Sequence, residues 1–102
     1  MTGKNSEELC PARRAIRALE MYRDLSTSER ARLIEIITES TDPEDSFQGL
    51  VRAKGLGSEE REKLVRGASR DPWTAFGALH YPDLDGLTPH QMDILRTAAA
   101  NI

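Results

Sequence analysis

The stretch Leu25-Ser-Thr-Ser-Glu-Arg-Ala-Arg-Leu33 returns twice along the chain at a constant spacing. The later copies read Leu56-Gly-Ser-Glu-Glu-Arg-Glu-Lys-Leu64 and Leu87-Thr-Pro-His-Gln-Met-Asp-Ile-Leu95, and the first leucines lie 31 residues apart each time. A fixed period in this range is typical of stacked helical units. The repeat therefore predicts an all-α fold, although it does not indicate an activity.

Each copy of this stretch contains a signal for the start of a helix. Ser26 with Glu29, and Thr88 with Gln91, match the capping box. In that motif a hydroxyl accepts a bond from a free backbone N–H, and the later acid or amide bonds back to the cap. The middle copy has Gly57 at the cap position, which is weaker but tolerated. A helix is expected to begin directly after each cap.

A second phrase marks the start of another set of helices. Asp precedes Pro at 42–43 and again at 71–72, which gives an N-cap acceptor followed by a residue whose φ already suits the first turn. Both copies continue with an apolar pair on one helical face: Phe47 with Leu50, and Phe76 with Leu79. One unit is therefore a capped helix followed by a helix that starts with proline.

These signals predict one all-helical domain over residues 1–102. We expect a small bundle of five to six short helices built from a degenerate two-helix repeat of about 31 residues. Its parts are a leading helix at about 6–24, repeat units at 25–55 and 56–86, and a terminal helix within 87–102. The helix expected at 26–40 is the richest in apolar residues, which predicts a central position.

The composition favours a small protein that does not enter membranes. Apolar residues make up 38% of the chain, so the core is expected to be small, and a homodimer contact is one way to supply further stability. The first 24 residues contain nine charged ones, unlike a signal peptide, and no apolar stretch reaches membrane-spanning length. The single Cys10 fits a reducing compartment. We therefore expect a cytoplasmic location and no membrane partner.

The net charge of −3 is unevenly distributed along the chain. Residues 46–70 contain six basic and three acidic residues. A nucleic-acid-binding transcriptional regulator that uses segment 52–70 is therefore an alternative function. Acidic residues alternate with the basic ones, which favours local pairing on a solvated face and makes nucleic acid the less favoured partner. The basic residues concerned are Arg61, Lys63, Arg66 and Arg70.

Residues capable of catalysis or metal binding do not form a recognised pattern. His80, Asp83, Asp85 and His90 lie within eleven residues, but they lack the helical i,i+4 spacing of paired ligands and the calcium-loop pattern. The sequence has no Gly-rich phosphate loop, and its serines lie mainly at helix caps rather than beside a base. We expect no catalysis, no metal site and no cofactor.

The two helices that start with proline differ at a position that could bind a partner. Trp73 corresponds to Glu44, and a glutamate in the first turn of a helix is expected to be exposed. The only tryptophan is then expected to be exposed too, and tryptophan is among the commonest hot-spot residues at protein interfaces. The alternative is that Trp73 covers the helix end and completes the sparse core.

The segment after the second such helix is also longer than its counterpart. Residues 80–86 replace the five residues 51–55 and are expected to bring His80 and Tyr81 beside Trp73. Exposed aromatic side chains with a polar rim suit protein binding. We therefore predict a small cytoplasmic regulatory protein of the inhibitor, antiactivator or adaptor type, whose partner-binding residues are Trp73, His80 and Tyr81.

Overall fold

The computed structural model describes residues 10–81, 84 and 86–102. These residues form helices and no strand, which confirms the predicted all-α fold, and none of their helices is long and apolar enough to cross a membrane. Residues 6–9 of the expected leading helix lie outside the described ones. The helices are α2 (Pro11–Met21), α3 (Thr27–Thr38), α4 (Pro43–Arg52), α5 (Ser58–Ala68), α6 (Pro72–Leu79) and α7 (Pro89–Ala99).

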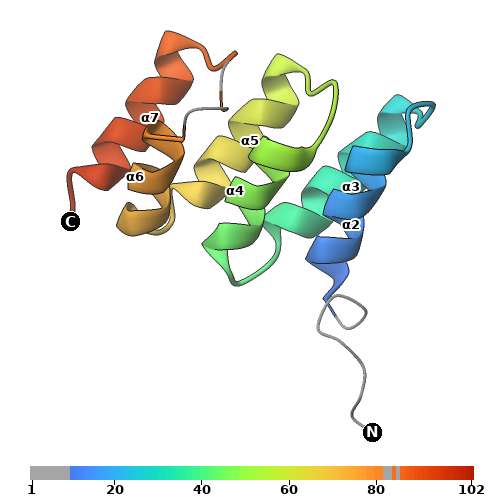
Figure 1. Cartoon of the computed structure of the whole chain (residues 1–102), viewed down its shortest axis with the longest axis horizontal. Coiled ribbons are helices and arrows are strands. Elements are labelled where there is room, and N and C mark those ends of the chain that lie inside the picture. The colour runs from blue at the N-terminus through green and yellow to red at the C-terminus, as the bar shows by residue number, and fades with distance from the viewer. Residues whose placement is uncertain (1–9, 82–83, 85) are drawn as a thin grey trace, which may run out of the picture.

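Consecutive helices form three pairs, which lie in a row. The most extensive contacts are those of α2 with α3, α4 with α5, and α6 with α7. Helices α2, α4 and α6 contact one another in order in one layer, and α3, α5 and α7 do so in the other. Figure 1 shows the α2–α3 pair at one end of the row and the α6–α7 pair at the opposite end. Each pair thus joins a helix that starts with proline to the capped helix that follows it.

The helix starts use the predicted caps. Ser26 Oγ accepts a hydrogen bond from the backbone N–H of Glu29 at 3.1 Å, and the Glu29 carboxylate accepts one from the Ser26 N–H at 2.8 Å. Thr88 and Gln91 exchange the same two bonds, both at 3.1 Å. The glycine cap has no side chain, so only the return bond forms there, and the Gly57 N–H donates it to the Glu60 carboxylate at 2.9 Å. Local hydrogen bonds therefore set these three helix starts.

The expected central position of helix 26–40 is wrong. The middle of the row is the α4–α5 pair, which contacts helices of both end pairs. This pair packs closely because α5 carries Gly67 where a larger side chain would collide with Ser46 of α4. Helix α3 belongs to an end pair: Ile34 and Ile37 are buried, while Leu33 and Ile36 are only half-buried.

An arginine of α3 joins the first two pairs. The Arg30 guanidinium contacts both oxygens of Glu60 on α5 at 3.1 Å and donates to the backbone oxygen of Lys54 at 3.0 Å. Partial burial alone would raise the pKa of the Glu60 carboxyl. The bonds from Arg30 and from the Gly57 N–H, with the charges of Arg30 and Lys63, outweigh that effect and hold the pKa below its ordinary value.

Candidate protein-binding surface

Helix α6 buries one side and exposes a row of aromatic rings on another. Ala75 and Ala78 lie in the core. Trp73, Phe76 and His80 follow one another at spacings of three and four residues, which places them on a common helical face. We call these three side chains the aromatic ridge.

The start of α6 is fixed by an acidic cap. The Asp71 carboxylate accepts hydrogen bonds from the backbone N–H and the hydroxyl of Thr74, both at 2.9 Å. Pro72 follows at the first helical position, where its missing N–H leaves no bond unmade. Trp73 therefore projects from a well-anchored first turn and not from a loose loop.

The rings of the ridge contact one another. Trp73 is 65% exposed and Phe76 is 43% exposed. Their ring centroids lie 6.2 Å apart with an angle of 78° between the planes, an edge-to-face arrangement. On its other side Phe76 contacts the His80 ring, with centroids 4.4 Å apart. The three rings therefore form one continuous exposed surface.

The structure brings together two of the three predicted partner-binding residues. Trp73 is exposed, so it does not complete the core, and Phe76 links it to His80. Tyr81 is half-buried and packs edge-on against Phe47 of α4, with ring centroids 5.6 Å apart. Tyr81 therefore helps to hold α6 to α4. Of the lengthened segment 80–86, residues 82, 83 and 85 lie outside the described ones.

Phe76 is the ridge residue that the sequence interpretation missed. The sequence pattern placed it, like Phe47, in an apolar pair on one helical face. Phe47 has Tyr81 against it, whereas the ring contacts of Phe76 are with two exposed neighbours. The spacing from Trp73 to Phe76 to His80 was the signal that could have found it.

Three of the four basic residues of the alternative nucleic-acid surface bind acceptors within the protein. Arg61 donates to the backbone oxygen of Gly86 at 3.1 Å, and Arg70 donates to that of Ser40 at 2.8 Å. Arg66 pairs with a glutamate one turn earlier at 3.1 Å. Lys63 is exposed. The contacts of Arg61 and Arg70 join segments that are distant in the sequence, whereas that of Arg66 lies within α5, so two of the four basic residues have a structural role.

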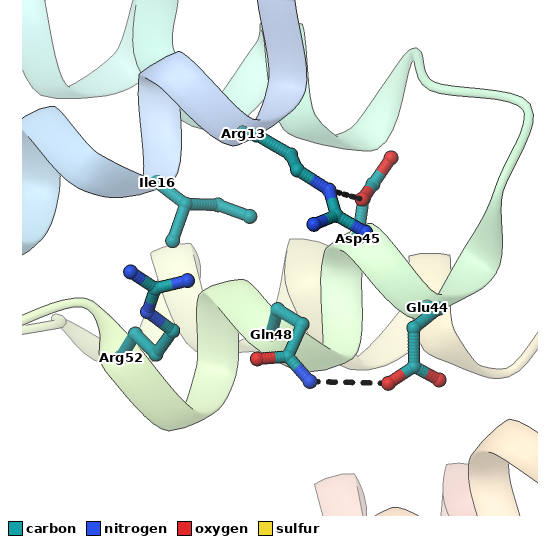
Figure 2. Close-up of a pocket in the computed structure, with 6 residues that line it drawn as sticks. All are labelled: Arg13, Ile16, Glu44, Asp45, Gln48 and Arg52. Atoms are coloured by element: carbon teal, nitrogen blue, oxygen red, sulfur yellow. Dashed lines mark hydrogen bonds and ion pairs between the residues drawn. The ribbon is translucent and has the colours of Figure 1, made fainter. Parts of the chain in front are cut away.

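A hollow lies between α2 and α4. Its volume is about 280 Å³, and the residues around it are Arg13, Ile16, Glu44, Asp45, Gln48 and Arg52. Figure 2 shows Arg13 directed at Asp45, with the Gln48–Glu44 hydrogen bond along α4. Asp45 is buried and accepts a bond from Ser40 Oγ at 2.6 Å, while Arg52 pairs with Glu20 of α2 at 2.9 Å. The Arg13–Asp45 and Arg52–Glu20 pairs join the two helices, whereas Glu44 bonds to Gln48 within α4.

The candidate metal ligands are in different places. His80 belongs to the ridge, whereas His90 lies on α7, 4.0 Å from Glu62. Asp83 and Asp85 lie outside the described residues. Among the residues that the structure describes, no three His, Cys, Asp or Glu side chains come together in a way that could hold a metal ion.

Comparisons of the chain with protein-family models, with curated proteins and with solved structures give no match.

Proposed function

We propose that this chain is a small regulatory protein that binds another protein through its aromatic ridge. It acts as an inhibitor, antiactivator or adaptor in the cytoplasm, without catalysis of its own. The observation that carries the proposal is the exposure of Trp73, a side chain that is highly buried in most proteins.

The ridge has the physical properties of an interface centre. Covering apolar surface stabilises a complex by about 25 cal/mol per Å², and tryptophan is among the residues whose truncation costs interfaces most. Trp73 and Phe76 contact each other edge to face, so one partner surface can cover both rings at once. A partner that covers both rings therefore buries two large apolar side chains.

Quantitative capture of the partner from the native host tests the proposal. Trp73→Ala combined with Phe76→Ala removes two ridge rings, and the expected loss of affinity is about 30-fold or more, since a hot-spot residue contributes about 2 kcal/mol. Tyr22→Ala is the matched control, because Tyr22, at the end of α2, is an aromatic residue that is 58% exposed and so comparable to Trp73. Equal capture by the ridge variant and the control would contradict the proposal.

The alternative function, a transcriptional regulator that binds nucleic acid, has less support. It depends on Lys63 and Arg66, because Arg61 and Arg70 already bind backbone oxygens. Phosphate contacts supply most of the affinity of such proteins and strengthen as salt is lowered. Titration with duplex DNA at low salt therefore tests it, and no binding there eliminates the alternative.

A further inference from the structure

The hollow between α2 and α4 carries opposite charges at its two ends. Glu44 and Asp45, in the first turn of α4, form an acidic end, and Arg52, in the last turn of the same helix, forms a basic end (Figure 2). Asp45 and Arg52 are seven positions apart, which corresponds to about 10 Å along a helix axis. A molecule that contacts both ends therefore needs opposite charges that are separated by a spacer.

The acidic end has carboxylate oxygens that the protein uses only in part. Asp45 is 3% exposed, and its Oδ2 accepts a hydrogen bond from Ser40 Oγ at 2.6 Å. Its Oδ1 lies 3.9 Å from Nε of Arg13, which is beyond hydrogen-bond distance. Within the described part of the chain, the Glu44 side chain accepts one hydrogen bond, from the Gln48 amide at 3.1 Å. Because a buried carboxylate is stabilised by a charged donor in direct contact, an ammonium group suits this end.

The basic end has guanidinium donors to spare. Nη2 of Arg52 donates to Glu20 of α2 at 2.9 Å, and a guanidinium has five N–H donors in a planar fork. The Arg52 side chain lines the hollow and is 35% exposed. Its remaining donors therefore suit a carboxylate, which guanidinium groups bind through two parallel hydrogen bonds.

The middle of the hollow offers an apolar side chain. On α2, Ile16 lies between Arg13, which is at the acidic end, and Glu20, which is at the basic end. On α4, Gln48 lies about one turn from either end. The volume of about 280 Å³ is near the lower limit for ligand pockets. A short chain of methylene groups suits this stretch.

We propose that the α2–α4 hollow binds a small linear zwitterion, an ω-amino acid whose methylene groups separate an ammonium from a carboxylate. The ammonium binds Asp45 and Glu44, the carboxylate binds Arg52, and the methylene groups lie along Ile16. This inference goes beyond the proposed function and does not rest on it, because the hollow belongs to α2 and α4 and the aromatic ridge belongs to α6.

Arg13 gives the proposal a consequence that a purely structural role of these charges does not have. The ligand ammonium replaces the long contact of Arg13 with Asp45, and the Arg13 side chain, which is 47% exposed, turns to solvent. Arg13→Ala removes this competing cation. The variant is therefore expected to bind the zwitterion more tightly, by about two- to fivefold, because breaking a long and half-exposed ion pair costs little.

NMR titration of the isotope-labelled full chain tests the proposal with four probes. ε-Aminocaproate has separated charges, caproate and hexylamine carry one charge each, and glycine has adjacent charges. We expect ε-aminocaproate to give saturable shifts of backbone amides in α2 and α4. Its affinity should exceed that of each other probe by about tenfold or more, since each of them loses a charged hydrogen-bond contact.

Variants at both ends of the hollow identify the contacts. Asp45→Asn and Arg52→Gln should each weaken the binding of ε-aminocaproate by about tenfold. Glu35→Gln, at an exposed ion pair of α3, is the matched control and should leave the affinity unchanged. Circular dichroism checks that each variant is folded. If Asp45→Asn unfolds the chain, Glu44→Gln replaces it, since Glu44 is only half-buried.

Several results would overturn this site. They are the absence of saturable shifts with ε-aminocaproate, equal affinity for any of the other three probes, and full affinity in the variants of the acidic end. Shifts of the Trp73 indole N–H in place of the α2 and α4 amides would put the probe on the aromatic ridge and would also contradict it. None of these results affects the capture of a protein through Trp73 and Phe76, so the proposed function is tested separately.

Discussion

The close crossing of α4 and α5 gives a prediction for the substitution Gly67→Ala. A Cβ atom at this position would collide with Ser46 Oγ and would lie 2.8 Å from Ser46 Cβ. Both residues are buried in the middle pair, so neither helix can move away without disturbing an end pair. The matched control is Gly77→Ala in α6, where a Cβ would meet nothing within 4 Å.

Two opposing terms set the size of the effect. Replacing a helical glycine by alanine stabilises the helix by about 1 kcal/mol, and overpacking a core costs about 1–3 kcal/mol. Because the new atom meets a second Cβ and not a flexible chain end, we expect the upper part of that cost. Gly67→Ala should therefore destabilise the protein by about 2 kcal/mol, whereas Gly77→Ala should stabilise it by about 1 kcal/mol.

Thermal unfolding followed by circular dichroism measures both variants. For a domain of about this size, 1 kcal/mol corresponds to about 4–8 °C in Tm. Gly67→Ala is expected to lower Tm and Gly77→Ala to raise it, and adding Ser46→Gly to the first variant should recover part of the loss. A rise in Tm for Gly67→Ala equal to that for Gly77→Ala would show that α4 and α5 do not cross this closely.

Three further predictions concern two regions of the protein. Two of them test the contact of α3 with α5, and the third tests the aromatic ridge. Arg30→Lys should lower the free energy of unfolding by about 1–2 kcal/mol, because lysine cannot contact both Glu60 oxygens and the backbone; Arg32→Lys, at an exposed pair, should change it by less than about 0.5 kcal/mol. Because the pKa of Glu60 is lowered in the folded chain, its stabilisation is present above the ordinary glutamate pKa and is lost as pH falls through the lowered value. Glu60→Gln should therefore flatten the acid side of a plot of Tm against pH, and an unchanged slope would contradict the pairing. Trp73→Ala should leave Tm nearly unchanged in a thermal melt, whereas a loss of about 3–5 kcal/mol would mean that the indole is a core residue.

The sequence was sufficient to predict the helices because their start signals are local. Each cap joins residues two to three positions apart, as with Asp42 and Glu44 or Asp71 and Thr74, so no knowledge of distant contacts is needed. The order of packing was not predictable in this way. It depends on which helices can approach closely, and that is decided by small residues on separate helices, such as Ser46 and Gly67.

The candidate surface was predicted only in part, because it too depends on packing between helices as well as on local sequence. Comparing Trp73 with Glu44 predicted an exposed tryptophan, and Trp73 is exposed, although Glu44 itself is half-buried beside the hollow between α2 and α4. Phe76 was missed and the contact of Tyr81 with Phe47 was not predicted, because the surroundings of each ring depend on which helix pair lies next to it. Phe47 has a neighbour on that side, and Phe76, in the last pair, is exposed.

Site-specific photo-crosslinking in the native host tests most directly the claim that the ridge binds protein. A photoreactive phenylalanine analogue replaces Trp73 in one variant and Tyr22 in another, since both positions are exposed and aromatic. We predict discrete cross-linked species, resolved by mass spectrometry, from position 73 and few or none from position 22. Cross-links of equal yield and identity from both positions, or none from position 73, would contradict the claim.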